Sequence, residues 1–508
     1  MRRTTVRSIF VLSSTLLLTI MPSSSASPSD SVSQLWKYTP QWSIISSPVL
    51  ANGFVYISDS SYGGGTQSVC CLNALTGTEV WRHIGRFAAF VVTNGKMYVG
   101  ESVQGSSSSF EGVIACLDAS TGVQLWNYSA GTGFTTPLVN GDIVFAGGSD
   151  YNMSTGANIG FVYAFNSSTG EKLWNFLGPG GTRFDSNSLV LEEAILYAKS
   201  TTYSSQDASW HSGIYAFNAY TGEGLWNYET PGQFGSLLAA NHNLYVSSNF
   251  VNTTNYLDAK KSGGYIYEGG VFALDGRNGT LLWNYPINSS VSTLVIMNNT
   301  IYAFSGNGIL YALNALYGGV VWSRNAAAGL GSLASINGYL YVGSSSGVYC
   351  FNANDGTVIW SFLASDFAGS SPTLPTYTDG IIYVGWNGPM FFSPVTEHNF
   401  YALSASNGEK LWSYTIGYTI TSSPTIQNGT VYIGGSFVTS RSPDYESSGV
   451  VLALKPSVAS LPLSPLPTPT QPVFEFLPLI VLVVVVAITV VAVVVAVVYW
   501  KKLKRQIR

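Results

Sequence analysis

The 508-residue sequence is poor in charge, cysteine and histidine. Charged side chains make up 9% of the chain, and no apolar period near 3.6 residues persists through its main part. These two absences argue against a helical bundle and a helical-repeat protein. The chain contains instead 53 glycines, 21 prolines and 14% aromatic residues, a balance that indicates an all-β protein with many turns.

Motifs for common chemistries are also lacking. The histidines His83, His211, His242 and His398 are not spaced as metal ligands, and no stretch has the pattern of a Ca²⁺-binding loop. No Ser/His/Asp set, phosphate-binding loop or C-x-x-C-H haem motif rises above chance. The sequence therefore predicts no catalytic residue and no metal site.

The few charges are unevenly distributed. Eight basic residues lie within 1–7 and 501–508, where no acidic residue occurs, and the sequence between them has 14 basic and 26 acidic residues. Because an acidic body repels a phosphate backbone, we do not expect nucleic acid as a partner.

Both ends of the chain have the composition of membrane-targeting segments. Residues 1–26 combine a basic head, an apolar stretch and small residues around Ala26, as in a secretory signal peptide; the alternative is an uncleaved N-terminal anchor. Residues 477–500 are uncharged, and within them Leu479 to Tyr499 are mostly Val and would span about 31 Å as a helix. We predict one transmembrane helix here.

The segments beside this helix fix the expected topology. Residues 456–476 contain six prolines and are expected to form a semi-rigid stalk in the polyproline II conformation; the alternative is a ligand for a proline-binding domain. The basic tail 501–508 should remain in the cytoplasm. Residues 27–455 would then form an ectodomain outside the cell membrane.

One phrase recurs eight times in this ectodomain, as in "YAFNSSTGEKLWNF" (163–176) and "YALSASNGEKLWSY" (401–414). In every copy a Gly lies four residues before a Trp, and Ala or Cys lies ten residues before it. The spacing between copies varies from 38 to 57 residues, which is typical of a structural unit with variable connections. The Trp residues are Trp81, Trp126, Trp174, Trp226, Trp283, Trp322, Trp360 and Trp412.

Each unit has the pattern of four short strands. An Asn-Gly or Asp-Gly pair closes a hairpin between the first and second strands of most units, and the Gly of the phrase supplies a left-handed turn between the third and fourth. Such units repeated around a ring form a β-propeller. We expect each Trp to fill the contact between neighbouring blades, with its ring N–H on a backbone acceptor.

A ninth Trp, Trp36, precedes the first complete unit, and the last unit has three strands and no Trp. Pairing the strand of Trp36 with that last unit closes the ring and removes its exposed edges. The predicted fold is therefore all-β, a single propeller of nine four-stranded blades.

The phrase A-x-[DN]-x-x-T-G-x-x-x-W resembles the tryptophan-docking motif of the pyrroloquinoline-quinone (PQQ)-like propeller repeats. These occur in quinoprotein alcohol dehydrogenases and in the outer-membrane assembly lipoprotein of the Bam complex. The resemblance covers about residues 36–455 and implies eight blades, the family norm. A ninth blade then requires either a ring wider than the family norm or the displacement of one unit that matches the repeat weakly. The units around 188–200 and 293–306 match it least well.

Enzymes of this family hold PQQ over Ca²⁺ with a catalytic Asp, a Trp floor and a ring formed by two adjacent cysteines. Cys70 and Cys71 match the last feature. The repeat argues against it, because Cys71 takes the small position that Ala holds elsewhere, as do Cys116 and Cys350. We expect PQQ with Ca²⁺ only if the chain is a dehydrogenase.

The connections between second and third strands vary most in length, and in a propeller they emerge on one face. Aromatic residues there suit binding of protein or glycan; alternatively they pack the loops onto the blades. The candidates are Trp210, Tyr256, Trp386, Phe391, Phe392 and Tyr445. Eight N-x-[ST] sequons are candidate glycosylation sites: Asn127, Asn152, Asn166, Asn252, Asn278, Asn288, Asn298 and Asn428.

The expected function is that of a membrane-anchored, extracytoplasmic propeller that serves as a binding scaffold at a prokaryotic cell surface. A PQQ-dependent alcohol or sugar dehydrogenase is the first alternative. A carbohydrate-binding surface protein is the second.

Overall fold

A computed structural model describes most of the chain between Val32 and Ser457. The described ranges are 32–61, 67–104, 110–152, 157–204, 209–251, 267–326, 331–363, 372–386, 398–420, 422–438 and 447–457. The predicted signal peptide, transmembrane segment and tail lie outside these ranges, as does the predicted stalk beyond Ser457. Within the described ranges, no helix has the length and apolar character needed to cross a bilayer.

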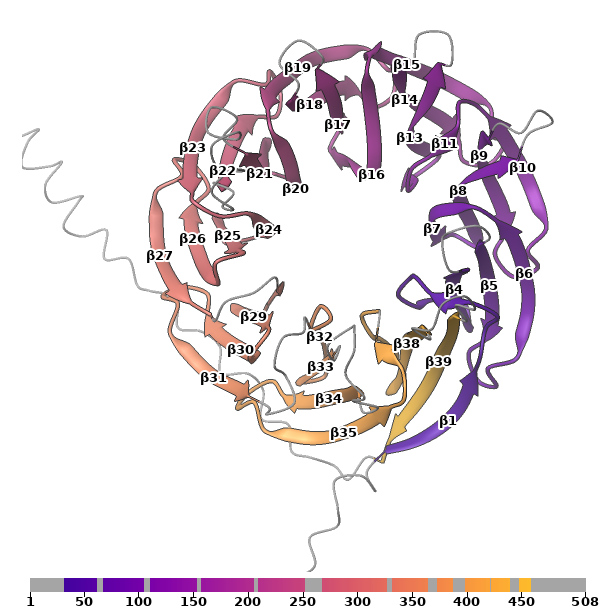
Figure 1. The fold of residues 1–508 in the computed structure, drawn as a ribbon, viewed down its shortest axis with the longest axis vertical. Coiled ribbons are helices and arrows are strands. Elements are labelled where there is room, and N and C mark those ends of the chain that lie inside the picture. Colours follow the sequence, from indigo (N-terminus) through magenta and orange to yellow (C-terminus); the bar gives the residue numbers. More distant parts are fainter. Residues whose placement is uncertain are drawn as a thin grey trace, which may run out of the picture.

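The described strands form nine antiparallel sheets that follow one another around a ring (Figure 1). The protein is therefore a single nine-bladed β-propeller, as the repeat count predicted, and the ring is wider than the family norm of eight blades. The segments 188–200 and 293–306, which fitted the repeat least well, each lie in a complete four-stranded blade.

We number the blades in chain order and give their strands from the inside of the ring outward. Blade 1 contains β2 (Ser43–Ile44), β3 (Val49–Ala51), β4 (Phe54–Ser60), β5 (Gln67–Asn73) and β6 (Glu79–Gly85). Blade 2 contains β7 (Phe87–Thr93), β8 (Lys96–Gln104), β9 (Phe110–Asp118) and β10 (Gln124–Ser129). Blade 3 contains β11 (Gly133–Phe134), β12 (Leu138–Asn140), β13 (Ile143–Asn152), β14 (Ala157–Asn166) and β15 (Lys172–Gly180).

The middle of the chain forms three four-stranded blades. Blade 4 contains β16 (Thr182–Glu192), β17 (Ile195–Ser204), β18 (Ser209–Asn218) and β19 (Gly224–Pro231). Blade 5 contains β20 (Gln233–Ala240), β21 (Asn243–Val251), β22 (Tyr267–Asp275) and β23 (Leu281–Ile287). Blade 6 contains β24 (Val291–Met297), β25 (Thr300–Ser305), β26 (Ile309–Asn314) and β27 (Val320–Asn325).

The last three blades complete the ring. Blade 7 contains β28 (Ser332–Ile336), β29 (Tyr339–Ser344), β30 (Gly347–Asn352) and β31 (Val358–Leu363). Blade 8 contains β32 (Thr376–Thr378), β33 (Ile381–Gly385), β34 (His398–Ser404) and β35 (Lys410–Ile416). Blade 9 contains β36 (Thr419–Ile420), β37 (Thr425–Gln427), β38 (Thr430–Val438), β39 (Ser447–Pro456) and, outermost, β1 (Val32–Tyr38).

Blade 9 is assembled from both ends of the described chain, as the position of Trp36 predicted. Strand β1 pairs antiparallel with β39, from Val32 opposite Pro456 to Tyr38 opposite Val451 (Figure 1). The propeller therefore extends one residue past the predicted boundary at 455. Closure gives blade 9 its fourth strand, so the outer edge of β39 is paired.

Turn chemistry explains the hairpins inside the blades. Asn52 and Gly53 have φ values of 51° and 82°, which the turn between β3 and β4 requires. At the other predicted Asn-Gly and Asp-Gly turns, both residues again have positive φ. Blade 3 is the exception, because Gly141 and Asp142 form its turn, one residue later than predicted.

The hydrophobic core lies between the blades. Nine clusters of buried side chains are present, and each combines residues from two neighbouring blades. Because strand residues alternate between faces, every blade contributes to the cluster on each side of it. The ring is thus stabilised at nine seams, which are the contacts between neighbouring blades.

Candidate functional site

Seven of the eight phrase Trp residues, and Trp36, pack on the phrase Gly of the following blade; the exception is Trp412, because blade 9 has no phrase Gly. A Cβ atom built on Gly222 would lie 2.6 Å from the ring of Trp174, and at all eight phrase glycines the corresponding distance to a Trp ring is 2.5–2.7 Å. These glycines also have φ between 69° and 74°. Glycine is therefore required twice over, for its backbone angle and for the approach of the indole.

Hydrogen bonds orient these indoles. Eight of the nine Trp ring N–H groups donate to a backbone carbonyl of the next blade at 2.8–3.2 Å, for example Trp174 to the carbonyl of Ala219. The ninth, Trp412, faces blade 9, where no turn joins the third and fourth strands because β39 and β1 come from opposite ends of the described chain. All nine Trp residues thus lie in seams.

An aromatic residue of the second strand completes each seam. It lies 5.8–6.2 Å from the Trp ring, measured between centroids, in all nine blades. In four blades a Tyr hydroxyl donates to the same carbonyl as the Trp, as Tyr302 and Trp322 both do to Ala353. Every seam thus contains a Trp and an aromatic partner, eight of the nine also contain the phrase Gly, and in four the Trp and a Tyr share one carbonyl.

The connections between second and third strands lie at one end of the ring, since all blades share one strand order. In blades 3 and 4 the paired strands extend far in this direction, with β13 and β14 paired through ten residues. In blades 6 and 7 the strands are short, and only residues 306–308 and 345–346 connect them. The face with these connections, the loop face, is therefore raised on one side of the ring.

The structure places few of the aromatic candidates on the loop face. Trp386 is 3% exposed and packs in the seam between blades 7 and 8, which favours the packing alternative for this residue. Trp210 lies in β18 opposite Tyr203, and only its backbone is described. Tyr256, Phe391, Phe392 and Tyr445 lie outside the described residues. Tyr151, in β13, is 47% exposed.

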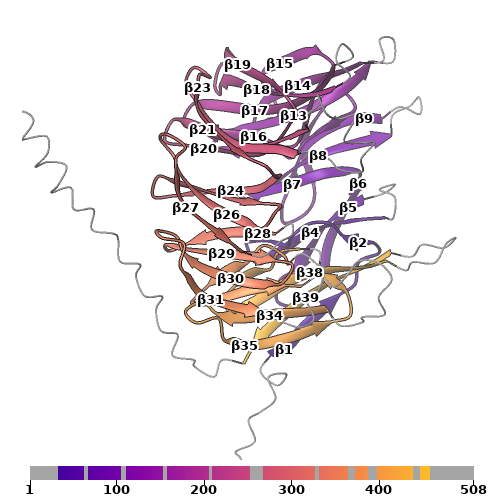
Figure 2. The same cartoon turned by 60° about the vertical axis from the view of Figure 1, so that its left-hand side comes forward.

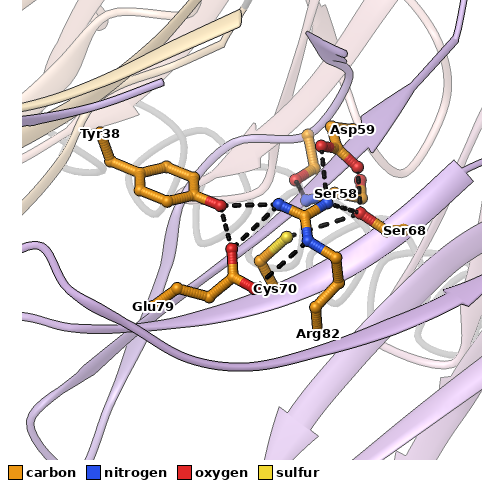
Figure 3. A network of polar contacts seen from close by, with 8 residues as sticks. Tyr38, Ser58, Asp59, Ser68, Cys70, Glu79 and Arg82 are labelled. Carbon is orange, nitrogen blue, oxygen red and sulfur yellow. Dashed lines mark hydrogen bonds and ion pairs between the residues drawn. The ribbon is translucent and has the colours of Figure 1, made fainter. Parts of the chain in front are cut away.

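A charged network lies where blade 9 meets blade 1 (Figure 3). Arg82, from β6, donates from Nη1 to Asp59 Oδ2 at 3.0 Å and from Nη2 to the hydroxyl of Tyr38 at 2.6 Å. Its Nη2 also donates to Glu79 Oε2 at 3.1 Å. Ser68 donates to Asp59 and accepts from Arg82, so one guanidinium joins β1, β4, β5 and β6.

Burial makes this network costly to break. The side chain of Asp59 is fully buried, whereas those of Arg82 and Glu79 are 17% and 35% exposed. Burial alone would lower the pKa of Arg82. Its hydrogen bonds to Glu79 and Asp59 outweigh this effect and raise the pKa above its usual value. Burial would likewise raise the pKa of Glu79, but the bonds from Arg82 and Tyr38 outweigh it and lower that pKa. The charged forms are thus favoured near neutral pH.

A second polar contact joins the other face of blade 1 to blade 2. His83 Nε2 lies 3.6 Å from Glu101 Oε2 of blade 2, and Glu101 is 5% exposed. Sequence reasoning identified none of the residues in these two contacts as functional. The available signal was the presence of acidic residues inside β-strands of a chain that has few charges.

The cysteines do not fit the cofactor ring of the family enzymes. Cys70 and Cys71 are fully buried in the regular strand β5, with Cys70 in the seam to blade 9 and Cys71 in the seam to blade 2. Their side chains point to opposite faces, and burial raises the pKa of each thiol to about 12. Among the described residues, no group of three His, Cys, Asp or Glu could hold a metal ion.

The sequons differ in accessibility. Asn127, Asn278, Asn288, Asn298 and Asn428 are exposed. Asn166 is partly buried, and its Oδ1 accepts from the backbone N–H groups of Ser168 and Thr169. The side chain of Asn152 and the whole of Asn252 lie outside the description.

A family model described as "Outer membrane protein assembly factor BamB" matches residues 65–256, 189–362 and 346–445, which is more than half of the chain. The chain belongs to this family of PQQ-like β-propeller proteins. The resemblance read from the Trp phrase is thereby confirmed.

Individual relatives are distant. The chain is 26% identical to tetrathionate hydrolase of Acidithiobacillus ferrooxidans over 250 residues (43% of this chain, 49% of the relative). It is 24% identical to outer membrane protein assembly factor BamB of Yersinia pestis over 225 residues (40% and 52%). It is 25% identical to quinohemoprotein alcohol dehydrogenase ADH-IIG of Pseudomonas putida over 258 residues (41% and 30%). The chain spans about half the length of the first two relatives and less of the third.

Solved structures similar to this one include quinohemoprotein alcohol dehydrogenase from Comamonas testosteroni. It gives a TM-score of 0.49 at 14% identity, and the match covers 84% of this chain and 76% of that one. BamB from Moraxella catarrhalis gives a TM-score of 0.44 at 13% identity, covering 84% and 99%.

Proposed function

We propose that the chain is a membrane-anchored, extracytoplasmic scaffold that binds a protein or glycan through its loop face. One observation carries the proposal. The packed ring presents one face on which the second and third strands of blades 3 and 4 extend well beyond the short strands of blades 6 and 7. Rigid scaffolds commonly present binding residues on such connections. Its relatives include an assembly factor as well as enzymes, so family membership alone does not select between a scaffold and an enzyme.

The loop face can be tested against the opposite face of the same ring. Tyr151 lies on a raised hairpin and is 47% exposed, whereas Leu75, in the turn between β5 and β6 at the other end of the blade, is 85% exposed. A photo-crosslinking residue placed at 151 should give a defined adduct in intact cells, and the same residue at 75 should not. Equal adducts at both positions, or adducts only at 75, would contradict a loop-face scaffold.

Anchoring has a separate test. A chain ending at Ser457 should be released into the medium or periplasm, whereas the full chain should remain with membranes after an alkaline wash. Release of the full chain by that wash would argue against a transmembrane anchor, and retention of the truncated chain would argue against the assignment of the anchor to 477–500.

The dehydrogenase alternative predicts that the protein acquires a quinone absorption band when PQQ is bound. If PQQ and Ca²⁺ added to the full chain produced a quinone absorption band and dye-linked alcohol oxidation, the scaffold proposal would fail. The buried, oppositely directed Cys70 and Cys71 provide no adjacent-cysteine ring for the cofactor. A glycan array tests the carbohydrate alternative, with loss of signal on Trp210→Ala as its expected signature.

A further inference from the structure

Both ends of the described chain leave the ring at the same place. Because neighbouring strands of a blade are antiparallel, the turns between first and second strands and between third and fourth strands lie opposite the loop face. We call this opposite side of the ring the turn face. Strand β38 begins at the turn face, after residues 428–429, so its antiparallel partner β39 ends there, at Pro456. Val32, the first residue of β1, lies opposite Pro456 and therefore on the same face.

We propose that the turn face is directed at the membrane that anchors the chain and that the loop face is directed away from it. The partner of the loop face then lies outside that membrane rather than within it. This orientation depends on the anchoring proposed above, but not on which end of the chain carries the anchor. A helix at 477–500 would be joined to the ring at Pro456, and an uncleaved anchor at 1–26 would be joined at Val32, both on the turn face.

The stalk limits the opposite orientation. Residues 458–476 would reach about 59 Å in the polyproline II conformation, at about 3.1 Å per residue. To bring the loop face to the membrane, this segment would have to reverse at the turn face and pass the whole rim. The ten residues of β39 give the rim of blade 9 a height of about 33 Å. Five prolines between 462 and 472 restrict the backbone and oppose such a reversal.

The turn face does not have the charge of a lipid-binding surface. Among the turns that the structure describes on this face, Arg277 is the only lysine or arginine. Seven exposed acidic residues lie in the same turns: Asp142, Glu171, Glu193, Glu223, Asp355, Asp379 and Glu409. Anionic headgroups repel such a face within a Debye length, about 8 Å at physiological ionic strength. The point of attachment, rather than adhesion to lipid, therefore directs the turn face at the membrane.

The raised part of the loop face lies far from the attachment. Strands β16, β17 and β18 of blade 4 lie across the ring from β1 and β39 (Figures 1 and 2). The long hairpins of blades 3 and 4 thus project away from the membrane on the side of the ring that is remote from the stalk. A partner that approaches from outside meets these hairpins first.

Energy transfer from a dye on the ring to an acceptor in the lipid tests the orientation. Tyr220→Cys places a thiol in the turn between β18 and β19, and Tyr151→Cys places one on the raised hairpin of the neighbouring blade; the native residues are 60% and 47% exposed. The four native cysteines are fully buried, so a membrane-impermeant maleimide dye labels the new thiol. Both variants of the full chain carry Asn152→Gln, which removes the sequon beside position 151.

The expected difference follows from the height of blade 3. Position 151 lies about 26 Å along β13 from the turn face, so transfer in vesicles with a lipid-linked acceptor should be at least about twofold greater from position 220. Equal transfer, or greater transfer from position 151, would overturn the orientation. Absence of transfer at both positions, with the chain recovered free of the vesicles, would contradict the anchor itself, and the orientation would fall with it.

A shortened stalk tests where the partner lies. Deletion of 462–472 leaves eight residues between Ser457 and 477, which reach about 25 Å, less than the height of the rim. A loop face directed away from the membrane needs no stalk to reach its partner, so the photo-crosslinked adduct at position 151 should persist in intact cells. Loss of the adduct while the shortened chain remains in the membrane would overturn the orientation. Absence of the adduct in the full chain would contradict binding by the loop face, whereas energy transfer would still report the orientation.

Discussion

The seam between blades 3 and 4 and the joint at which β1 meets blade 1 differ in the chemistry that surrounds the Trp. At the first, Trp174 lies on Gly222 among apolar side chains, and Tyr215 of the same cluster donates to Glu229 Oε1 at 3.1 Å within blade 4. At the second, Trp36 makes the same contact with Gly77, but Tyr38, Arg82, Glu79 and Asp59 add a charged network beside it. The repeated contact is therefore sufficient for an ordinary seam and is supplemented at closure.

Chain connectivity offers a physical reason for this difference. Blades 3 and 4 are adjacent in sequence, so β15 and β16 reach one another with little loss of loop entropy. Strand β1 must find β39 across more than 400 residues, and its "LWKY" closely resembles the outer strands of other blades. We interpret the Arg82 network as the feature that favours the correct partner for β1, since directional polar contacts discriminate where apolar ones do not.

Removal of an ordinary seam Trp should have the largest effect. Trp174→Ala deletes a buried indole and its hydrogen bond to Ala219, and we expect a loss of about 3–5 kcal/mol in the free energy of unfolding. Val80→Ala, at an exposed bulge, serves as the control in the same denaturant titration. A loss below about 1 kcal/mol for Trp174→Ala would mean that the seam is not the unit of stability.

Breaking the network from one side should cost nearly as much. Arg82→Met leaves Asp59 buried and without its charged partner, and we expect a loss of about 3 kcal/mol. The double variant Arg82→Met with Asp59→Asn should recover much of it, because the unpaired buried charge is gone. The specificity interpretation makes a further prediction for that double variant: β1 should be cleaved by protease faster than in the wild type although overall stability is similar. If β1 were cleaved at the wild-type rate, the network would stabilise the fold but would not select the partner of β1.

Two glycines separate backbone strain from packing. Gly222 and Gly53 both have positive φ, 74° and 82°, but a Cβ on Gly222 meets Trp174 whereas a Cβ on Gly53 has open space within 4 Å. Gly53→Ala should cost about 1 kcal/mol for strain alone, and Gly222→Ala about 2–3 kcal/mol. Thermal unfolding of both variants checks the difference. Equal losses would show that the indole moves aside, and the seam would then be less rigid than proposed.

Much of the fold was accessible from the sequence because the seam repeats. The Trp, the Gly four residues before it and the small residue ten residues before it each occupy one role in every blade, so their spacing survives the varied connections. The same repetition gave the blade count and the pairing of β1 with β39. The aromatic of the second strand also recurs, but it lies across a variable connection from the Trp, so its fixed distance was not evident.

The sites that do not repeat were the ones that sequence reasoning missed. Arg82 and Asp59 meet within the sheet of blade 1, and Tyr38 joins them only because closure brings β1 beside β6. Trp386 could not be assigned to the seam rather than to the loop face, because it lies just after the end of β33. Position within a repeat predicts packing well, whereas contacts made once depend on the three-dimensional course of the chain.

Acid should weaken closure before it weakens an ordinary seam. The pKa of Glu79 is lowered in the folded protein by Arg82 and Tyr38, so its contribution is complete above the unfolded pKa of about 4.3 and is lost as the pH falls through the lower folded value. Because Glu79 is 35% exposed, solvent screening should keep this contribution below about 1 kcal/mol. Amide exchange of β1, relative to that of β15, which carries Trp174 and has no acidic residue, should be constant from pH 7 to 5 and should accelerate below pH 4, after correction for intrinsic rates. Glu79→Gln should abolish that difference. If β1 and β15 responded to acid alike in the wild type, the polar network would not distinguish closure from the other seams.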